Sequence, residues 1–221
     1  MDASADFKSR IEQAAQKLGL GLSELQIDQL QKYVHSLLKW NRTYNLTALR
    51  EPDQILVHHI FDSLALIPFI SKYLDTERNN MPGTMIDVGS GGGLPGVVLA
   101  ICFPDWQVHC VDAVEKKKAF IRQLRGILKL ENLQACHGRI EELDSFKADI
   151  IVSRAFASLR DFVTLSSAHL KPDGIFIAMK GLVPEKEIQD LALHTTWKVW
   201  HIDTLGVPDL NAQRCLVWIR G

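Results

Sequence analysis

The sequence has few of the features that mark secreted, membrane or metal-binding proteins. It contains only four cysteines, and no two of them form a Cys-x-x-Cys pair. It contains no run of about 18 apolar residues that would predict a membrane-spanning helix, and its charged start does not resemble a secretory signal. We therefore expect a cytoplasmic protein with reduced thiols, no metal site and no membrane contact.

Charge of either sign is not in excess, since 25 Lys and Arg residues are balanced by 26 Asp and Glu. Only the distribution of charge can therefore indicate a nucleic-acid partner. Residues 29–50 contain no acidic side chain, and a second segment carries a basic stripe at helical spacing, formed by Lys118, Arg122, Arg125 and Lys129. Each segment is either a solvated helix face or a surface for an anionic partner.

The organisation of the chain changes near residue 80. Its 221 residues are enough for one substantial core. Apolar residues recur at helical intervals up to a polar break at 75–83, with Ser23 as the N-cap of a second helix and a third helical stretch that runs into Pro68. We therefore expect a helical extension over residues 1–80 and a larger domain over residues 81–221.

The second part alternates between strand-like and helical segments. Strand-like runs lie at 84–88, 107–111, 133–137, 149–153 and 174–179, and helical segments lie between them at 95–103, 115–129 and 158–170. This alternation predicts an α/β fold with a parallel sheet covered by helices. Two final strand-like runs, 197–202 and 214–220, are joined by a short connection and predict an antiparallel hairpin on the sheet edge.

The segment MIDVGSGGGLPGVVLAI (85–101) places five glycines between a predicted strand and a predicted helix. Glycine lets the backbone turn tightly and approach a ligand, and a helix N-terminus supplies free N–H groups. The loop fits two patterns. Residues 91–96 match the Gly-x-Gly-x-x-Gly of dinucleotide sites, and residues 87–93 have the Asp-x-Gly-x-Gly-x-Gly form that resembles motif I of S-adenosylmethionine-dependent methyltransferases.

Residues after the neighbouring strands complete the predicted crevice. Asp112, 16 residues after Gly96, ends the second strand and is expected to accept hydrogen bonds from ribose hydroxyls. Ile140 and Glu141 follow the third strand, where we expect them to cover an adenine ring and to approach its edge. The short chain, the terminal hairpin and Asp87 before the loop favour S-adenosylmethionine over a dinucleotide.

Several collinear motifs make nearly the whole chain similar to a known family. They are WNRTYNLTA (40–48), HHIFDSL (58–64), DVGSGGGLPGVVLAI (87–101), EKKKAFI (115–121), SRAFASL (153–159) and MKG (179–181). Together they resemble the bacterial small-subunit rRNA (guanine-N7) methyltransferase family RsmG, formerly called GidB. Generic methyltransferases lack the N-terminal helices, and GSGGGLPG followed by SRAF and MKG is far more specific than the glycine loop alone.

This resemblance implies a class I, Rossmann-like S-adenosylmethionine-dependent methyltransferase with a mostly parallel seven-stranded sheet, a C-terminal antiparallel hairpin and an N-terminal helical extension. It implies methylation of N7 of one guanine in 16S rRNA, position 527 in the 530 loop. Carried over by motif, the family's cofactor contacts fall on Gly89, Leu94, Ile140, Glu141 and Arg154. The loop and strand ends add Asp87, Gly91, Gly93 and Asp112 to the expected cofactor-binding residues, and the expected RNA contacts are Arg42, Arg122, Arg125 and Lys180.

The implied reaction needs no catalytic base. Guanine N7 carries a lone pair and no proton at neutral pH, so it can attack a methyl sulfonium directly. No Ser-His-Asp, Cys-His or paired-carboxylate arrangement is evident, and we expect no catalytic residue of that kind. The enzyme's task is to position N7 in line with the methyl group. Because the major groove of helical RNA is deep and narrow, the target base is expected to be looped out or single-stranded.

The residues alone leave alternatives open. One is a methyltransferase of the same fold acting on a small molecule or a protein, and another is a nucleotide-binding regulator without catalysis, using NAD. Naked rRNA and a small-subunit particle are both candidate substrates, and a monomer is the default expectation. Lys180 either contacts phosphate or forms a salt bridge.

Four side chains near the N-terminal motifs also have two interpretations. Asn41 and Asn45 either cap a helix or contact RNA or the cofactor. His58 and His59 are adjacent on a predicted helix and therefore point to different faces, so we expect packing or a hydrogen bond to Asp62 rather than metal binding.

Overall fold

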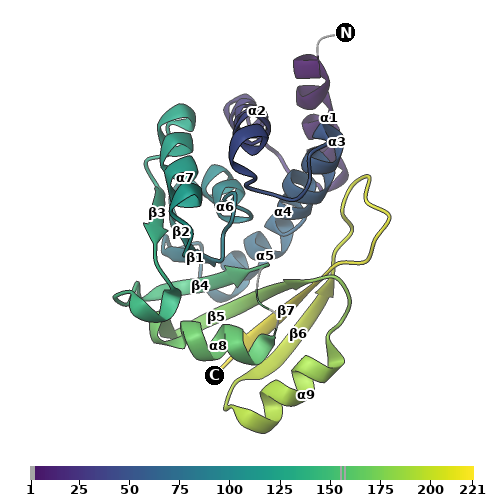
Figure 1. Ribbon diagram of the computed structural model, residues 1–221. Coiled ribbons are helices and arrows are strands. Elements are labelled where there is room, and N and C mark those ends of the chain that lie inside the picture. The colour runs from purple at the N-terminus through teal and green to yellow at the C-terminus, as the bar shows by residue number, and fades with distance from the viewer. Residues whose placement is uncertain (1–2, 155, 157) are drawn as a thin grey trace.

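The computed structural model describes residues 3–154, 156 and 158–221. Within them a seven-stranded sheet with the order β3-β2-β1-β4-β5-β7-β6 runs through the middle of the molecule, between two layers of helices (Figure 1). The strands are β1 (Thr84–Val88), β2 (Gln107–Asp112), β3 (Leu133–His137), β4 (Ala148–Ser153), β5 (Leu170–Lys180), β6 (Lys198–Thr204) and β7 (Cys215–Arg220). Each coincides with a strand-like run of the sequence, although β5 begins earlier than expected.

The α-helices in the described residues are α1 (Ala3–Lys17), α2 (Glu24–Tyr44), α3 (Pro52–Ile55), α4 (Asp62–Leu64), α5 (Ile67–Glu77), α6 (Gly96–Cys102), α7 (Glu115–Leu128), α8 (Leu159–Ser166) and α9 (Glu185–His194). A wider π-helical stretch, η1 (Leu56–Phe61), links α3 to α4, and two short 3-10 turns are η2 (Ile140–Glu142) and η3 (Ser167–His169). The predicted N-cap of α2 at Ser23 is confirmed, and it forms a capping box, because the side chains and backbones of Ser23 and Gln26 bond reciprocally. Helix α9 was not expected from the sequence. Leu191 is its one buried residue, so the helix has only a weak periodic pattern of apolar residues.

The direction of the strands confirms the mixed sheet. Strands β1 to β5 are parallel, and β7 pairs antiparallel with both β5 and β6. The terminal hairpin is therefore confirmed, but its second strand lies inside the sheet, between β5 and β6. Cys215–Ile219 are buried and apolar on both faces, whereas β6 is partly exposed along its length, so β6 suits the edge position.

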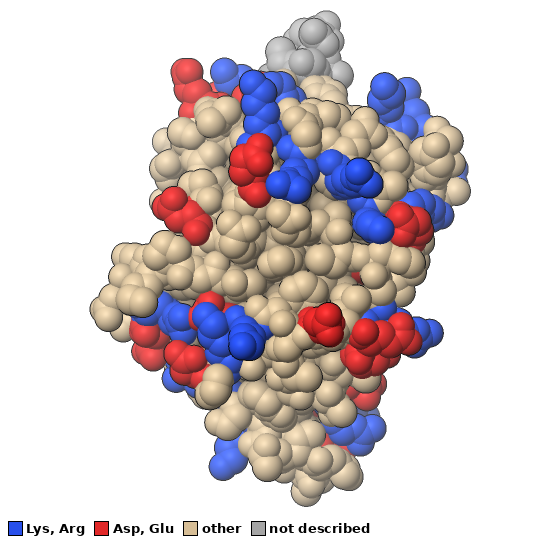
Figure 2. Space-filling view, turned by 90° about the vertical axis from the view of Figure 1, so that its left-hand side faces the viewer, with Lys and Arg blue, Asp and Glu red and all other residues tan. Residues whose placement is uncertain are grey.

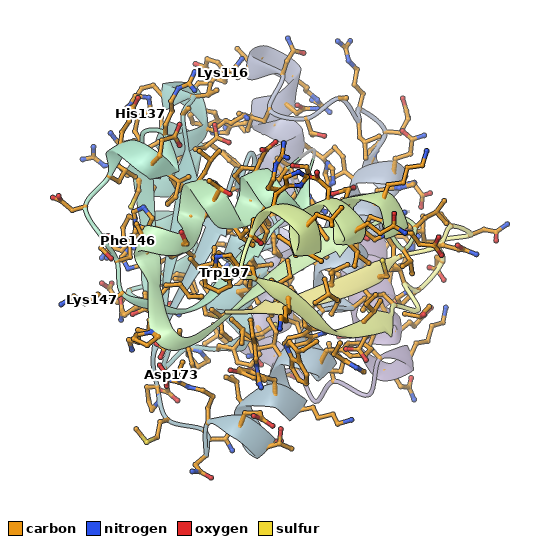
Figure 3. All side chains as sticks on the ribbon, turned by 90° about the horizontal axis from the view of Figure 1, so that it is seen from below. Lys116, His137, Phe146, Lys147, Asp173 and Trp197 are labelled. Atoms are coloured by element: carbon orange, nitrogen blue, oxygen red, sulfur yellow. The ribbon has the colours of Figure 1, made fainter. Side chains whose placement is uncertain are left out.

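Helices cover the two faces of the sheet unequally (Figure 1). The face with α2, α6 and α7 holds the larger buried cluster, in which Leu30 and Leu37 of α2 belong to the same core as Val97 of α6. The other face is covered by α8 and α9. There Trp197 lies near the middle of the view from below (Figure 3), with its ring centroid 5.0 Å from that of Phe176. The helices before residue 80 thus share a core with the sheet.

One segment has membrane-spanning character by composition, contrary to the expectation from the sequence. Pro52–Glu77 is long enough to cross a membrane, with a mean hydropathy of 1.4 in its most apolar window, but 67% of that window is buried inside the protein. It serves as a core helix of the fold. Pro68 does not end it, because the proline stands in the first turn of α5, where its missing N–H breaks no helical bond.

All four cysteines are free, as expected. Cys110 and Cys215 are buried, and Cys102 and Cys136 are partly buried. Burial raises the pKa of the Cys102 thiol to about 12, so this side chain is an unreactive apolar group at neutral pH.

Candidate cofactor and RNA site

The glycine loop leaves the carboxyl end of β1 and adopts backbone conformations that need glycine. Gly89, Gly91 and Gly93 have φ angles of 72°, 57° and 90°, in the region that side chains disfavour. A Cβ atom on Gly93 would also lie 2.5 Å from Cγ2 of Val97. The three glycines are therefore required by the turn itself.

Asp112 fastens this loop to the end of β2. Its Oδ2 accepts hydrogen bonds from the Gly91 N–H at 2.9 Å and from Lys117 Nζ at 3.1 Å, and its Oδ1 accepts one from the Val114 N–H at 3.0 Å. The sequence predicted that this carboxylate accepts ribose hydroxyls. Both oxygens instead already hold protein donors, so Asp112 shapes the loop as well as lining the crevice.

Asp87 lies beneath the loop rather than facing a ligand. Its side chain is fully buried, and its Oδ2 accepts a hydrogen bond from the Gly96 N–H at 2.7 Å. Within the described residues its Oδ1 has no partner. Burial raises the pKa of this carboxyl to about 7, against the opposing effect of the Gly96 N–H. Asp87 therefore supports the start of α6 from inside the protein.

A cavity of about 370 Å³ opens beside the loop at the carboxyl ends of β1 to β3, a size that suits a nucleoside-like ligand. Its lining combines the loop, both neighbouring strand ends and α8, and consists of Val88, Gly89, Val111, Asp112, Ala113, Lys117, Gly138, Arg139, Ile140, Glu141, Phe156 and Leu165. Four of the nine predicted cofactor-binding residues line it, namely Gly89, Asp112, Ile140 and Glu141. The strand-end position of this crevice is the one that open α/β sheets use for ligands.

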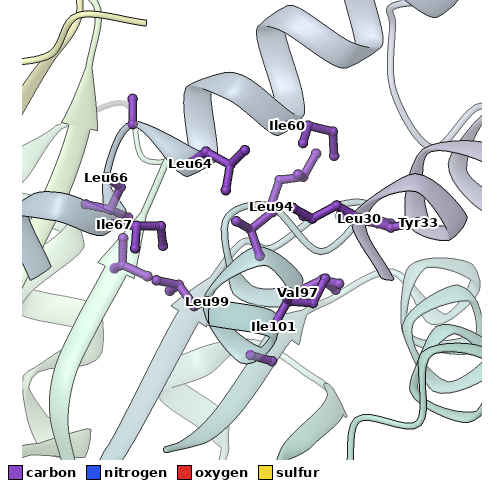
Figure 4. Close-up of a cluster of buried hydrophobic side chains, with 14 of the residues drawn as sticks. Leu30, Tyr33, Ile60, Leu64, Leu66, Ile67, Leu94, Val97, Leu99 and Ile101 are labelled. Atoms are coloured by element: carbon purple, nitrogen blue, oxygen red, sulfur yellow. The ribbon is translucent and has the colours of Figure 1, made fainter. Parts of the chain in front are cut away.

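The other predicted cofactor residues lie elsewhere. The side chain of Leu94 is buried and points into the core, where Figure 4 shows it between Leu30, Ile60 and Leu64. Its contact with a cofactor could involve only backbone atoms. Gly91 and Gly93 shape the loop behind the cavity, and Arg154 lines a different pocket.

That second pocket, of about 310 Å³, lies where β4, β5 and β7 meet the N-terminal helices, and it is lined by His58, His59, Asp62, Arg154, Met179, Lys180, Gly181 and Arg214. Arg154 Nη1 donates to Oδ2 of Asp62 at 2.9 Å, and Arg214 Nε donates to Oδ1 of the same carboxylate at 2.9 Å. Lys180 forms the salt bridge that was one of its two interpretations, at 2.8 Å from Oε2 of Glu187.

Of the two contacts expected for the histidines, packing is borne out for His59, which is largely buried, whereas the hydrogen bond to Asp62 is not formed in the described residues. The Asp62 carboxylate holds arginines, and His59 Nε2 instead lies 2.7 Å from the Thr47 hydroxyl. Burial and the nearby charge of Arg154 lower the pKa of His59 to about 4, so the ring is neutral at pH 7. No group of three or more potential metal ligands occurs in the residues that the structure describes.

The two asparagines organise the end of α2. Asn41 is buried, and its side chain accepts from the Thr47 N–H at 2.8 Å and donates to the Leu49 carbonyl at 2.7 Å. Asn45 ends the helix in the left-handed conformation, with a φ of 49°. Both therefore build the loop that follows α2, which is the capping interpretation.

The predicted basic surfaces lie on α2 and α7, which pack together. Figure 2 looks onto the α7 side and shows Lys and Arg gathered on its upper part, with some acidic side chains among them. Arg42 and Arg122 are exposed. Arg125 is partly engaged, because it lies 3.4 Å from Gln134 Oε1 and 3.6 Å from Glu131 Oε2. Lys116 extends this basic side of α7 and lies at the same corner as His137 (Figure 3).

Comparison with known proteins identifies the family. A family model named GidB, rRNA small subunit methyltransferase G, matches residues 26–217. The chain belongs to the GidB family. It is 51% identical over 218 residues to the "Ribosomal RNA small subunit methyltransferase G" of Bordetella petrii, covering 99% of this chain and 84% of that protein. It is 46% identical over 222 residues to the protein of the same name from Acidovorax sp. (strain JS42), covering 99% and 97%. The GidB match begins near the start of α2, so nearly all of α2 and the helices that follow it lie within the matched region, whereas α1 precedes it.

Solved structures agree on the fold of this GidB member. A SAM dependent methyltransferase from Aquifex aeolicus matches with a TM-score of 0.57 at 16% identity, covering 80% of this chain and 97% of that one. A ribosomal protein L11 methylase from Lactobacillus delbrueckii subsp. bulgaricus matches with a TM-score of 0.53 at 18% identity, covering 72% and 75%. The class I, Rossmann-like methyltransferase fold expected from the sequence is confirmed.

Sequence reasoning missed three residues that shape the site. Lys117 lines the cavity beside Asp112, Arg214 lines the second pocket, and Tyr33 reaches the glycine loop from α2. Lys117 could have been predicted, because it stands in the first turn of α7, directly after the end of β2 that carries Asp112. Nothing in the local sequence marks Arg214 or Tyr33, because their partners lie far away along the chain.

Proposed function

We propose that this GidB family member transfers the methyl group of S-adenosylmethionine to N7 of a guanine in 16S rRNA, position 527 in the 530 loop. The observation that carries this proposal is the family match over residues 26–217, together with relatives about half identical and named for methylation of small-subunit rRNA. The Asp-x-Gly-x-Gly-x-Gly loop opening onto a strand-end cavity of about 370 Å³ supports the cofactor.

The cavity lining fits an adenosine-containing cofactor. Ile140 and Glu141 both line the cavity, where Ile140 would cover the adenine ring and Glu141 would approach the polar edge of the base. Gly89 lets the loop backbone approach the ligand closely. Asp112 holds the loop in shape through the Gly91 N–H and presents its carboxylate to the ribose side of the cavity. The cofactor supplies an electrophilic methyl group on sulfur.

The chain's own residues then need only bind and orient the two substrates. Because N7 bears a lone pair and no proton, no side chain has to remove one, and we assign no general base. Holding the base and the methyl group in line replaces a random bimolecular encounter by an oriented one. This positioning lowers the barrier and accelerates methyl transfer. The basic faces of α2 and α7, with Arg42, Arg122 and Arg125, are proposed to contact the RNA backbone.

We further propose that residues 1–80 act as a helical extension that contributes RNA contacts, while residues 81–221 bind the cofactor. The protein is proposed to act in the cytoplasm as a monomer on either free 16S rRNA or a small-subunit particle. Light scattering of the purified protein and methylation of the two substrates side by side would distinguish these possibilities.

The decisive experiment is titration calorimetry with S-adenosylmethionine and, separately, NADH, followed by nucleoside mass spectrometry of 16S rRNA incubated with protein and cofactor. We expect binding of S-adenosylmethionine alone and the appearance of 7-methylguanosine within the 530 loop. Binding of NADH without S-adenosylmethionine would contradict the proposed function. Methylation of a protein or a small molecule, but not of rRNA, would contradict the substrate.

A further inference from the structure

The carboxylate of Asp62 joins two arginines that come from distant parts of the chain. Arg154 follows β4 and binds one oxygen of Asp62 at 2.9 Å, while Arg214 precedes β7 and binds the other at 2.9 Å. Asp62 itself stands at the start of α4, among the N-terminal helices. One side chain of the helical extension therefore fixes two guanidinium groups at the carboxyl edge of the sheet.

Burial and charge make this arrangement suited to an anion. The Asp62 side chain is 5% exposed, whereas those of Arg154 and Arg214 are 22% and 25% exposed and line the pocket of about 310 Å³. Lys180 adds a third cation, paired with Glu187. Three cations thus face two carboxylates, and His59 is neutral. Among these side chains the cations outnumber the carboxylates, in a partly desolvated pocket where a bound anion interacts strongly. Buried Asp87, whose pKa is raised to about 7, also interacts with Arg154 from inside the protein.

Arg214 keeps donors for a ligand. Its Nε binds Asp62 and its Nη1 donates to the Gln213 carbonyl at 2.9 Å. Within residues 3–154, 156 and 158–221, no hydrogen bond engages Nη2 of Arg214. The guanidinium is planar, and its N–H donors point in fixed directions. When Asp62 holds Nε of Arg214, it therefore also fixes the direction in which Nη2 points.

The pocket adjoins both the cofactor cavity and the predicted RNA surface. Phe156 lines the cavity, and its carbonyl oxygen accepts a hydrogen bond from Lys180 Nζ at 3.1 Å on the pocket side. On the opposite side His59 contacts Thr47, in the loop that follows α2 and its exposed Arg42. A strand of RNA that crosses from α2 toward the cofactor therefore passes this pocket.

We propose that Arg214 binds a backbone phosphate of the RNA next to the target base, and that Asp62 is a positioning residue that orients Arg214 and Arg154. This inference rests on the proposed function, because it names the RNA as the source of the anion. The carboxylate of the bound cofactor is the other anion that the same chemistry fits, and the experiment separates the two. Guanidinium groups form strong, directional bonds with phosphate oxygens.

The test compares Arg214→Gln and Arg214→Lys with a matched control, Arg160→Gln. This control removes a partly exposed arginine of α8 that pairs with Asp190 of α9. KM and kcat for 16S rRNA, the salt dependence of RNA binding, and the Kd of S-adenosylmethionine are measured, with thermal melting as a check of folding. We expect Arg214→Gln to raise the KM for RNA about tenfold and to reduce the salt slope by about one. Its kcat should stay within about twofold and its Kd for S-adenosylmethionine should not change, whereas Arg214→Lys should restore part of the KM.

Asp62→Asn examines the positioning role through additivity. It removes the charge and replaces one of the two accepting oxygens by an NH2 donor, so the amide can hold only one of the two arginines. We expect it to raise the KM for RNA as Arg214→Gln does. The double variant should then be no worse than Arg214→Gln alone, because the two residues act as one unit. If Asp62→Asn fails to fold, the Arg214 variants still decide the proposal, since Arg214 lies in the connection before β7 and its side chain is partly exposed.

Three outcomes would overturn the proposal. An unchanged KM and salt slope in Arg214→Gln would show that Arg214 does not contact an RNA phosphate. A raised Kd for S-adenosylmethionine with an unchanged KM for RNA would assign Arg214 to the cofactor carboxylate. A wild-type protein that binds S-adenosylmethionine but leaves 16S rRNA unmethylated would overturn the proposed function itself, and with it the RNA as source of the anion.

Discussion

The hydroxyl group of Tyr33 donates a hydrogen bond to the carbonyl oxygen of Gly92 at 2.7 Å. Tyr33 is fully buried on α2, whereas Gly92 lies in the middle of the glycine loop. Leu37, one turn further along α2, also lies against this glycine, because a Cβ atom on Gly92 would come within 3.1 Å of its Cδ1. Helix α2 therefore shapes the glycine loop that opens onto the cavity at the strand ends.

We expect Tyr33→Phe to weaken the binding of S-adenosylmethionine about five- to tenfold. The substitution removes one buried hydrogen bond, worth on the order of 1 kcal/mol, from a loop that must be ordered when the cofactor binds. Titration calorimetry gives the Kd. Tyr44→Phe is the control, because Tyr44 stands on the same helix but is 45% exposed. An unchanged Kd in Tyr33→Phe would mean that the loop holds its shape without α2.

Gly93→Ala should destabilise the loop, whereas Gly126→Ala should not. Gly93 has a φ of 90° and a Cβ there would lie 2.5 Å from Val97, so alanine adds backbone strain on the order of 1 kcal/mol or more and a clash. Gly126 lies in α7 with open space around its Cβ position, and alanine there should stabilise the protein by about 0.5–1 kcal/mol. Denaturant unfolding measures both changes.

The same pair should also differ in cofactor binding. We expect Gly93→Ala to bind S-adenosylmethionine at least about tenfold more weakly, a difference of roughly 1.4 kcal/mol, and Gly126→Ala to bind it as the wild type does. Equal affinities in the two variants would show that the loop adapts to a side chain at residue 93.

Asp87 should make stability fall as the pH rises toward neutrality. Its pKa is raised by burial from the model-compound value of 3.8 to about 7. The folded state therefore holds the proton more tightly than the unfolded state, and the favourable contribution is complete below about pH 4 and lost as the pH rises through 7. Asp87→Asn keeps an acceptor for the Gly96 N–H but cannot ionise.

The measurement is the free energy of unfolding of both proteins at pH 5 and pH 8. We expect Asp87→Asn to gain stability relative to the wild type over this range, by at most on the order of 3 kcal/mol. A constant difference between the two proteins would indicate that Asp87 does not titrate in this window.

Arg42→Ala and Arg122→Ala should each weaken RNA binding and lower its salt slope by about one, without changing the Kd of S-adenosylmethionine. Both side chains are exposed. Arg125→Ala should have a smaller effect, because this arginine already interacts with Gln134 and Glu131. Filter binding at several salt concentrations provides the slopes.

Lys186→Ala is the control for these arginine variants, since Lys186 is exposed on α9, on the opposite face of the sheet. If the control variant changed RNA binding as much as Arg42→Ala, the basic faces of α2 and α7 would have no special role. If none of the three arginine variants changed it, the RNA would bind another surface.

Much of the fold was predictable because strands and helices leave local patterns. All seven strands, the break near residue 80 and the cap at Ser23 follow from periodicity and turn residues. Helix α9 was missed because its buried surface is small. The place of β7 inside the sheet was also missed, since adjacency in the sequence suggests a hairpin at the edge while burial decides which strand is covered.

The candidate site was predicted in outline but not in its side-chain roles. Gly89, Ile140 and Glu141 line the cavity as expected, because they lie at strand ends that the topology brings together. Leu94 and Asp87 were expected at the ligand, and they lie in the core instead. A motif fixes where a residue stands along the chain, but it does not fix which way the side chain points.

The sequence by itself determined the α/β class, the glycine loop and the family, because these depend on local spacing and on motifs that are read along the chain. Only the tertiary structure decided which groups meet. The bond of Tyr33 to Gly92 and the double ion pair of Asp62 with Arg154 and Arg214 join residues that are far apart in sequence. Such contacts arise when helices pack on the sheet and bury polar groups, which must then find partners wherever the fold places them.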